Sequence, residues 1–334
     1  MAIDLELCVD GKQWDELVEN SSYGTIFHTW DFLKIIEKHT PSKLYPILGL
    51  KGTNPIGLYP LFYQKKGFLK LVFSPPPHVA IPYMGPIFIN FEKLKQNKKE
   101  SLFNQFQKEV DAYISNDLNP SYIHILTIPD FIDSRPFLWL NYNVTPKYNY
   151  VIDLSHGLDF VWKNLKKKLR QNICKEDKKG VVIRKGTEKD MQEIYSLLSE
   201  RYKDQDKNTR VNSDYLISLY SHFHPQNMKI SVAEYEGEIL GGLIDLYYKN
   251  KASSWIGNPK PKNTSIQSTD LLQWEAIKRS YNTGCSSYEE VGANTQRLCR
   301  YKSKFNPDLS INFSAKKTDL LASISEKTYN KLLR

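Results

Sequence analysis

The sequence lacks the signatures of covalent and of metal catalysis. Its 334 residues include only four cysteines, none spaced as Cys-x-x-Cys, so neither a disulfide framework nor a zinc site is indicated. Neither a Gly-x-Ser-x-Gly elbow nor a Gly-x-x-x-x-Gly-Lys-Ser/Thr loop occurs, which argues against a serine nucleophile and a P-loop nucleotide site. The seven histidines show no paired spacing for a metal on a helix. We therefore expect no metal and no tightly bound cofactor.

Long hydrophobic runs are also missing. No apolar stretch approaches the roughly 20 residues that a membrane helix needs. The acidic start, Met1 to Leu7, lacks the basic and then apolar layout of a signal peptide. We expect a cytoplasmic protein without an integral membrane segment. Its length favours two domains over one.

The formal net charge is +9, and much of it lies in one stretch. Ten lysines and arginines fall between Lys163 and Lys185. This density favours a phosphate-bearing partner, such as a nucleotide-linked substrate, a tRNA or an anionic surface, which includes peripheral contact with a membrane. The alternative is a solvated helix face, which composition alone does not separate from the first interpretation.

One pattern of apolar residues and turns occurs twice. A hairpin predicted over 47–66 aligns without a gap with one predicted over 230–251, and six positions are identical, among them Gly52 with Gly237 and Gly57 with Gly242. In this alignment Pro60 lies where the second copy has Asp245. Helical periodicity precedes each hairpin. Each is followed by a strand (83–89 or 253–257), a helix (92–116 or 269–282) and a further strand (122–127 or 287–292). The repeat predicts duplication of one α/β unit.

The two copies set the domain boundaries. We expect a first domain over 1–147 and a second over 148–315. Leu320, Leu321, Ile324 and Leu332 share one face of a helix predicted over 316–334. Because an isolated helix of this length is marginal in water, we expect it to pack back on the first domain.

The chain resembles the FemAB-like branch of the GNAT acyltransferase superfamily over most of its length, most clearly from Asn149 to Pro307, and four blocks carry the resemblance. They are 148–155 with its Asp-Leu-Ser end, the basic 166–173 with Lys179-Gly180-Val181, 271–277 with Gly284, and Glu290-Val291-Gly292 with 301–305. The resemblance implies an α/β fold of two tandem GNAT-like domains, each a mixed, mostly antiparallel sheet flanked by helices. It also implies an N-acyltransferase whose second domain is catalytic and which transfers an acyl or aminoacyl group to an amine of an anionic or nucleotide-linked acceptor. The same resemblance suggests a role in the cell envelope, while the identity of the acceptor stays open between a cell-envelope precursor, a glycan and a peptide.

The segment that should bind the acyl donor departs from the superfamily pattern. Residues 258–267 contain no glycine, although close approach of a backbone to a pyrophosphate needs glycines. The usual way of binding acetyl-CoA is therefore disfavoured. As acyl donor, we expect an aminoacyl-tRNA rather than an acyl thioester such as acyl-CoA or acyl carrier protein. Asn306 replaces a glycine of the family, a change that a turn with positive φ tolerates. Lys260 and Lys262 remain able to meet phosphates through their side chains.

The resemblance assigns one catalytic residue, and the residues around it suggest three more. Lys302 occupies the position of a family lysine that contacts the acyl donor and stabilises charge there. Asp245 and Glu290 are alternative general bases, because a carboxylate in a half-buried sheet can have a raised pKa. Either could instead be a structural partner of Lys302 or Arg297. Tyr301 is a candidate acid for the leaving group.

The candidate binding residues are polar or basic. Arg170 matches a family arginine at the acceptor diphosphate, and Lys34 is a looser match to a second phosphate contact, although Arg170 could simply cap its helix. Ser268 or Thr269 would cap the helix over 269–282 and offer its N-terminus to an anion. Arg297 completes the set.

Two other functional classes stay open. One is a non-catalytic duplicated GNAT scaffold that binds a nucleotide sugar or RNA, which the missing glycines fit. The other is an assembly module whose basic helix binds nucleic acid with steep salt dependence.

Overall fold

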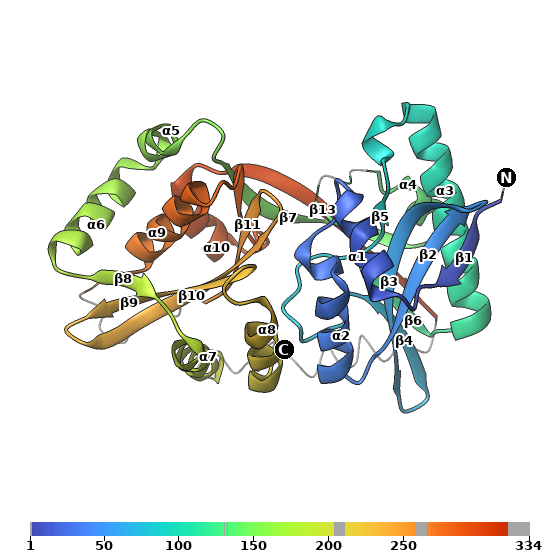
Figure 1. Cartoon of the computed structure of the whole chain (residues 1–334), viewed down its shortest axis with the longest axis horizontal. Coiled ribbons are helices and arrows are strands. Elements are labelled where there is room, and N and C mark those ends of the chain that lie inside the picture. The colour runs from blue at the N-terminus through green and yellow to red at the C-terminus, as the bar shows by residue number, and fades with distance from the viewer. Residues whose placement is uncertain are drawn as a thin grey trace. The chain divides into compact units, whose positions relative to one another are not determined.

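The computed structural model describes residues 2–129, 131, 133–203, 211–257, 266 and 268–319. They form two compact units (Figure 1). Of the described residues, unit 1 comprises those up to 147 together with 311–319, and unit 2 comprises those from 148 to 310. None of the helices in the described ranges is long and apolar enough to cross a membrane.

Unit 1 is built on strands in the order β1-β2-β3-β4-β6-β13, with β5 paired to β3. Neighbouring strands are antiparallel except β4 and β6, which are parallel. One face is covered by α3 and the other by α1 and α2. The strands are β1 (Asp4–Leu7), β2 (Lys43–Lys51), β3 (Asn54–Lys66), β4 (Leu69–Ser74), β5 (Ile87–Phe88), β6 (Tyr122–Leu126) and β13 (Asp308–Thr318). The helices are α1 (Gly11–Asn20), η1 (Ile26–His28), α2 (Trp30–His39), η2 (Phe91–Lys93), α3 (Gln96–Tyr113), η3 (Ile114–Leu118) and α4 (Arg135–Trp139).

Unit 2 repeats this plan in the order β7-β12-β11-β10-β9-β8. Here β11 and β12 are the parallel pair. The strands are β7 (Asn143–Asp153), β8 (Val182–Lys185), β9 (Met228–Tyr235), β10 (Glu238–Tyr248), β11 (Lys251–Gly257) and β12 (Ser287–Glu290). The helices are α5 (Leu158–Asn164), α6 (Lys167–Lys178), α7 (Glu188–Lys203), α8 (Ser213–Phe223), α9 (Ser268–Asn282), α10 (Gln296–Lys302) and η4 (Ser303–Phe305).

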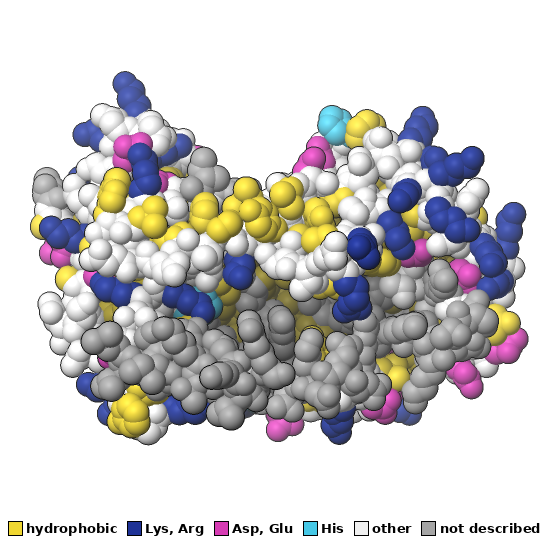
Figure 2. Space-filling model, turned by 180° about the vertical axis from the view of Figure 1, so that it is seen from behind, with side chains coloured by type: hydrophobic (Ala, Val, Ile, Leu, Met, Phe, Trp, Pro, Cys, Tyr) yellow, Lys and Arg dark blue, Asp and Glu magenta, His cyan; other side chains and the backbone are white. Residues whose placement is uncertain are grey.

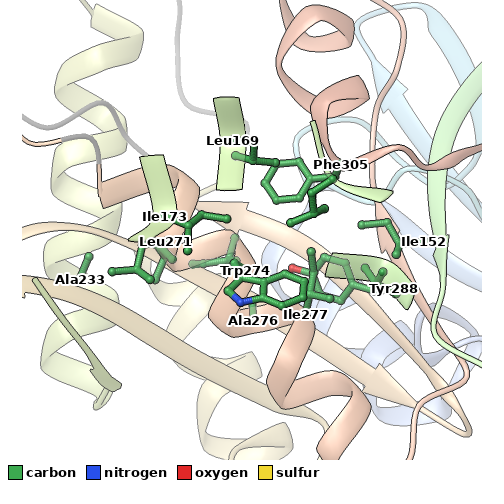
Figure 3. Close-up of a cluster of buried hydrophobic side chains, with 14 of the residues drawn as sticks. Ile152, Leu169, Ile173, Ala233, Leu271, Trp274, Ala276, Ile277, Tyr288 and Phe305 are labelled. Carbon is green, nitrogen blue, oxygen red and sulfur yellow. The ribbon is translucent and has the colours of Figure 1, made fainter. Parts of the chain in front are cut away.

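The core of unit 2 lies between the sheet and α9. Trp274 and Ile277 of α9 pack with Tyr288 of β12, Leu169 of α6 and Phe305 of η4 (Figure 3). Burial of these large side chains stabilises the unit by roughly 1.5–3 kcal/mol each before entropy is counted. The cluster holds α6, α9 and η4 on one face of the sheet and so fixes the elements that carry the candidate site.

Both predicted hairpins are confirmed, but their gap-free alignment is wrong by one residue. The two-residue loops are 52–53 and 236–237, so Gly52 is first in its loop and Gly237 is second. A slip of one residue moves every side chain of a strand to the opposite face. Accordingly a Cβ on Gly57 would meet Phe106 of α3, whereas one on Gly242 would meet Ile194 of α7, on the other face. Leu61, rather than Pro60, is therefore the counterpart of Asp245.

Two other expectations need correction. The strand after the first hairpin is β4, whereas 83–89 contains only the two-residue β5. Residues 316–318 of the expected C-terminal helix continue β13. Its remaining residues from Leu320 onward lie outside the described residues.

Candidate active site

Glu290 is the last residue of β12, which lies between β7 and β11 in the unit 2 sheet. It pairs with Ser254 of β11 on one side and with Tyr150 of β7 on the other. Its side chain is buried, and neither carboxylate oxygen has a hydrogen-bond partner among the described residues. Burial raises the pKa of Glu290 to about 7, against the opposing charge of Lys302. A carboxyl with this pKa can take up or release a proton at neutral pH.

Lys302 ends α10 and is half-buried. Its Nζ donates to the backbone carbonyl oxygens of Val291 and of Gly292, the latter at 3.2 Å. Burial lowers the pKa of Lys302, and the nearby charge of Glu290 opposes this shift. Because an ammonium group has three N–H donors, one of them stays available for a substrate oxygen.

The loop that follows β12 is fastened to β7. Asn149, which is buried, accepts the backbone N–H of Gly292 through Oδ1 at 2.7 Å. Asn294 is bonded to Tyr148 in both directions, accepting its N–H at 2.9 Å and donating to its carbonyl at 3.0 Å. These bonds fix the two carbonyl groups that hold Lys302. Asn149 and Asn294 were missed as functional residues, although they lie in or beside blocks that the sequence singles out.

Tyr150 and Cys299 lie next to this pair and were also missed. Tyr150 faces Glu290 in the strand register, and both Tyr150 and Cys299 are half-buried. The pKa of Tyr150 is raised first by burial and then by its hydrogen bond with Cys299. Cys299 precedes Lys302 by three residues on α10, so their side chains lie on the same side of that helix. The cluster therefore contains four titratable groups.

Asp245, the other candidate base, has both oxygens engaged. Oδ2 forms an ion pair with Arg279 Nη2 at 2.7 Å, and Oδ1 accepts the hydroxyl of Tyr288 at 2.9 Å. Its side chain is fully buried, and burial raises its pKa while the charge of Arg279 opposes the rise. Asp245 thus anchors α9 to the sheet through Arg279, and not through Lys302 or Arg297 as the sequence suggested.

The start of α9 differs slightly from expectation. Because α9 begins at Ser268, Ser268 and Thr269 lie inside its first turn rather than at the preceding cap position. Ser268 is buried. Tyr301 donates its hydroxyl to the carbonyl oxygen of Thr269 at 3.4 Å, which connects α10 with the start of α9.

The remaining predicted residues are basic and are scattered. Arg170 donates to the carbonyl of Lys163 at 3.3 Å, so it caps α5 rather than its own helix. Arg297 is exposed on α10 and forms no ion pair with a described residue. Lys34 belongs to unit 1 and pairs with Glu37 on α2. Lys260 and Lys262 lie outside the described residues.

Positive charge gathers over one end of unit 2. Figure 2 shows lysine and arginine side chains over the α5 and α6 region. Helix α6 is held against α9 by a hydrogen bond of 2.9 Å from Asn172 to Asp270. Among the described residues, no group of histidine, cysteine and acidic side chains could hold a metal ion.

Residues 163–303 match the family model of the acetyltransferase (GNAT) domain. The matched range contains three of the four titratable groups of the cluster, and Tyr150 lies before it. Unit 2 carries a GNAT acyltransferase domain. The sequence expectation of a GNAT-type acyltransferase is thereby confirmed. No protein among the curated sequences matches the chain.

Solved structures extend the GNAT likeness to nearly the whole chain. FemX is similar over 93% of this chain and 96% of its own, with 11% identity and a TM-score of 0.70. The C-terminal domain of a protein described as a lysylphosphatidylglycerol synthetase, from Agrobacterium fabrum, is similar over 96% of both chains (12% identity, TM-score 0.58). A tandem GNAT protein from the clavulanic acid biosynthesis pathway is similar over 94% of this chain and 98% of its own (9% identity, TM-score 0.53). The predicted fold of two GNAT-like units in tandem is confirmed.

Proposed function

We propose that the chain is an N-acyltransferase that moves an acyl or aminoacyl group to an amine of an anionic or nucleotide-linked acceptor. The donor would be an aminoacyl-tRNA ester or an acyl thioester. The observation that carries the proposal is the buried carboxyl of Glu290, with a pKa of about 7, beside the ammonium group of Lys302. The domain belongs to an acyltransferase family, and these two groups provide what an amide-forming transfer requires.

The proposed chemistry needs no covalent intermediate. The amine nitrogen attacks the donor carbonyl carbon, and its proton passes to Glu290. The free N–H of Lys302 stabilises the oxyanion that forms. The C–O or C–S bond then breaks, and the alcohol or thiol leaves with the proton returned by Glu290, so that the site ends as it began. Asp245 does not take this role, because Arg279 and Tyr288 occupy its oxygens.

A comparison of the two units supports placing the chemistry in unit 2. In unit 2, Glu290 pairs with Ser254 across the parallel strands β12 and β11. In unit 1, Ile125 pairs with Ser74 across the corresponding strands β6 and β4, so Ile125 is the counterpart of Glu290. With Leu61 as the counterpart of Asp245, both carboxylates of unit 2 have apolar counterparts in unit 1. The first copy therefore has no equivalent proton acceptor at these positions.

We propose that basic residues of unit 2 bind the negatively charged group of the acceptor. Arg170 and the lysines of α6 present cations at the protein surface, and the first turn of α9, at Ser268 and Thr269, adds a helix N-terminus. Arg297 is a further exposed cation near Lys302 in the chain. Lys34, from the family resemblance, and Lys260 and Lys262, from the basic character of their segment, remain proposals from the sequence.

The test is a transfer assay with both donor classes. Purified protein is incubated with a mixture of charged tRNAs or with acyl-CoA, together with amine acceptors, and new amides are identified by mass spectrometry. We expect transfer by the wild type and a loss of about a hundredfold or more in kcat for Lys302→Met. Arg300→Met, an exposed change on the same helix, is the control and should keep full activity.

A non-catalytic scaffold is the rival function, and the glycine-free segment 258–267 favours it. It predicts a nucleotide sugar or RNA that co-purifies with the protein and is not chemically altered. Absence of transfer with every donor, combined with such a ligand in native mass spectra, would overturn the acyltransferase proposal.

A further inference from the structure

A positively charged hairpin, formed by β3 and β4, protrudes from unit 1. Together with the neighbouring strand β2, its residues run from Lys43 to Ser74 and include five lysines and no acidic residue. Figure 1 shows the β3–β4 hairpin extending beyond the helices of unit 1. The charge of this segment is therefore not balanced within its own strands.

The apex of the hairpin exposes a large apolar ring. The turn joins Lys66 to Leu69 through Gly67, whose φ is +60°, and Phe68. The side chain of Phe68 is 78% exposed. Figure 2 shows hydrophobic side chains flanked by lysine or arginine side chains at this end of unit 1. Because most of the Phe68 ring is exposed, it gains little from burial in the folded chain and is accessible to a partner.

Lysines and tyrosines share one face of the sheet behind this apex. Lys65 pairs with Lys70 across β3 and β4, and Lys43 pairs with Tyr63 across β2 and β3. Directly opposite like charges destabilise a hairpin, and neither Lys65 nor Lys70 forms an ion pair with a described residue. The ring of Tyr63 contacts that of Tyr45, with centroids 6.2 Å apart. The repulsion would be relieved by an anionic partner.

We propose that this hairpin tip, Lys65 to Lys70 with Lys43, Tyr45 and Tyr63 behind it, docks on the surface of an anionic lipid bilayer. Phe68 and Leu69 would enter the boundary between headgroups and acyl chains, where an aromatic ring gains from burial. The lysines would lie at the level of the phosphates, and tyrosines favour the same interface. A projecting turn with an apolar apex and lysines on both sides matches the interface of an anionic bilayer, where an apolar layer lies directly below a layer of phosphates. The inference does not depend on the donor or acceptor of the transfer reaction.

The test is sedimentation of the full chain with lipid vesicles and no substrate. Vesicles of phosphatidylcholine alone are compared with vesicles in which a third of the lipid is phosphatidylglycerol. We expect binding only to the anionic vesicles, weakened by salt. Phe68→Ser should weaken it at least about tenfold. The double change Lys65→Gln and Lys70→Gln should weaken it by about 25-fold, since each lysine near such a surface is worth about fivefold.

Matched controls lie elsewhere on unit 1. Val9→Ser removes an apolar side chain that is 89% exposed, and Lys98→Gln with Lys108→Gln removes two exposed lysines of α3. Both should leave vesicle binding unchanged. Equal binding by the wild type and the hairpin variants, or no binding by the wild type, would overturn the proposal. So would a loss of tRNA binding in the hairpin variants while vesicle binding is kept, because the tip would then serve a nucleic acid.

Discussion

Replacing Glu290 by glutamine should stabilise the protein at alkaline pH. The pKa of this carboxyl is about 7 in the folded chain against an ordinary 4.5, so the folded state holds a proton that the unfolded chain has released. Stability must therefore fall as the pH rises from about 4.5 to about 7. A pKa difference of this size corresponds to about 3 kcal/mol at 1.36 kcal/mol per pKa unit. Glu290→Gln removes the ionisation and with it this loss.

The assay is urea unfolding at about pH 5 and about pH 8, with hydrogen–deuterium exchange of β10 to β12 peptides to assign the transition to unit 2. We expect the variant to differ little from the wild type at the lower pH and to be more stable by up to about 3 kcal/mol at the higher pH. Glu275→Gln, which removes a half-buried carboxylate that is already paired with Lys278, should change neither value appreciably. A variant that is equally destabilised at both pH values would refute the reasoning, because Glu290 would then be bound by contacts and not by an unfavourable charge.

Four other changes have definite expected outcomes. Arg279→Leu leaves Asp245 buried without its cation and should lower the free energy of unfolding by about 3–5 kcal/mol. The loss should be smaller when Asp245→Asn is added, and equal losses for the single and the double variant in chemical denaturation would contradict the pairing. Gly242→Ala brings a Cβ within 2.1 Å of Ile194 and should cost about 1–3 kcal/mol, partly restored by Ile194→Val in thermal melts. Asn149→Ala should free the loop that holds Lys302 and lower kcat with little change in KM; a change in KM alone would count against this positioning role. Arg170→Ala should weaken acceptor binding by roughly tenfold in calorimetry. Unchanged affinity would show that Arg170 only caps α5 and does not bind the acceptor.

The repeated hairpins could be predicted because alternation of apolar residues is local information. Their relative register could not be predicted, because it depends on which loop residue takes positive φ. In one loop this is Gly52, whereas in the other both Glu236 and Gly237 do so. Aligning the glycines of the two turns, Gly52 with Gly237, therefore gives a register that is wrong by one residue. The correction changes which residue of the first copy corresponds to Asp245.

The two candidate carboxylates could be named from the sequence but not ranked. Asp245 and Glu290 both lie within strands of one sheet, and their difference arises from side chains distant in sequence. Arg279 and Tyr288 bond to the carboxylate of Asp245, whereas no described residue hydrogen-bonds to the carboxylate of Glu290. The carbonyl groups that hold Lys302 depend likewise on Asn149, which precedes Gly292 by 143 residues. Such contacts are fixed only by tertiary packing.

The central claim is that Glu290 accepts the proton of the attacking amine, and the pH dependence of kcat/KM tests it most directly. With any donor and acceptor pair that gives turnover, the wild type should show an ascending limb with an apparent pKa of about 7. Glu290→Gln should lose this limb together with most of the activity, while the Arg300→Met control keeps both. Persistence of the same limb in Glu290→Gln would contradict the account and assign the proton transfer to another group.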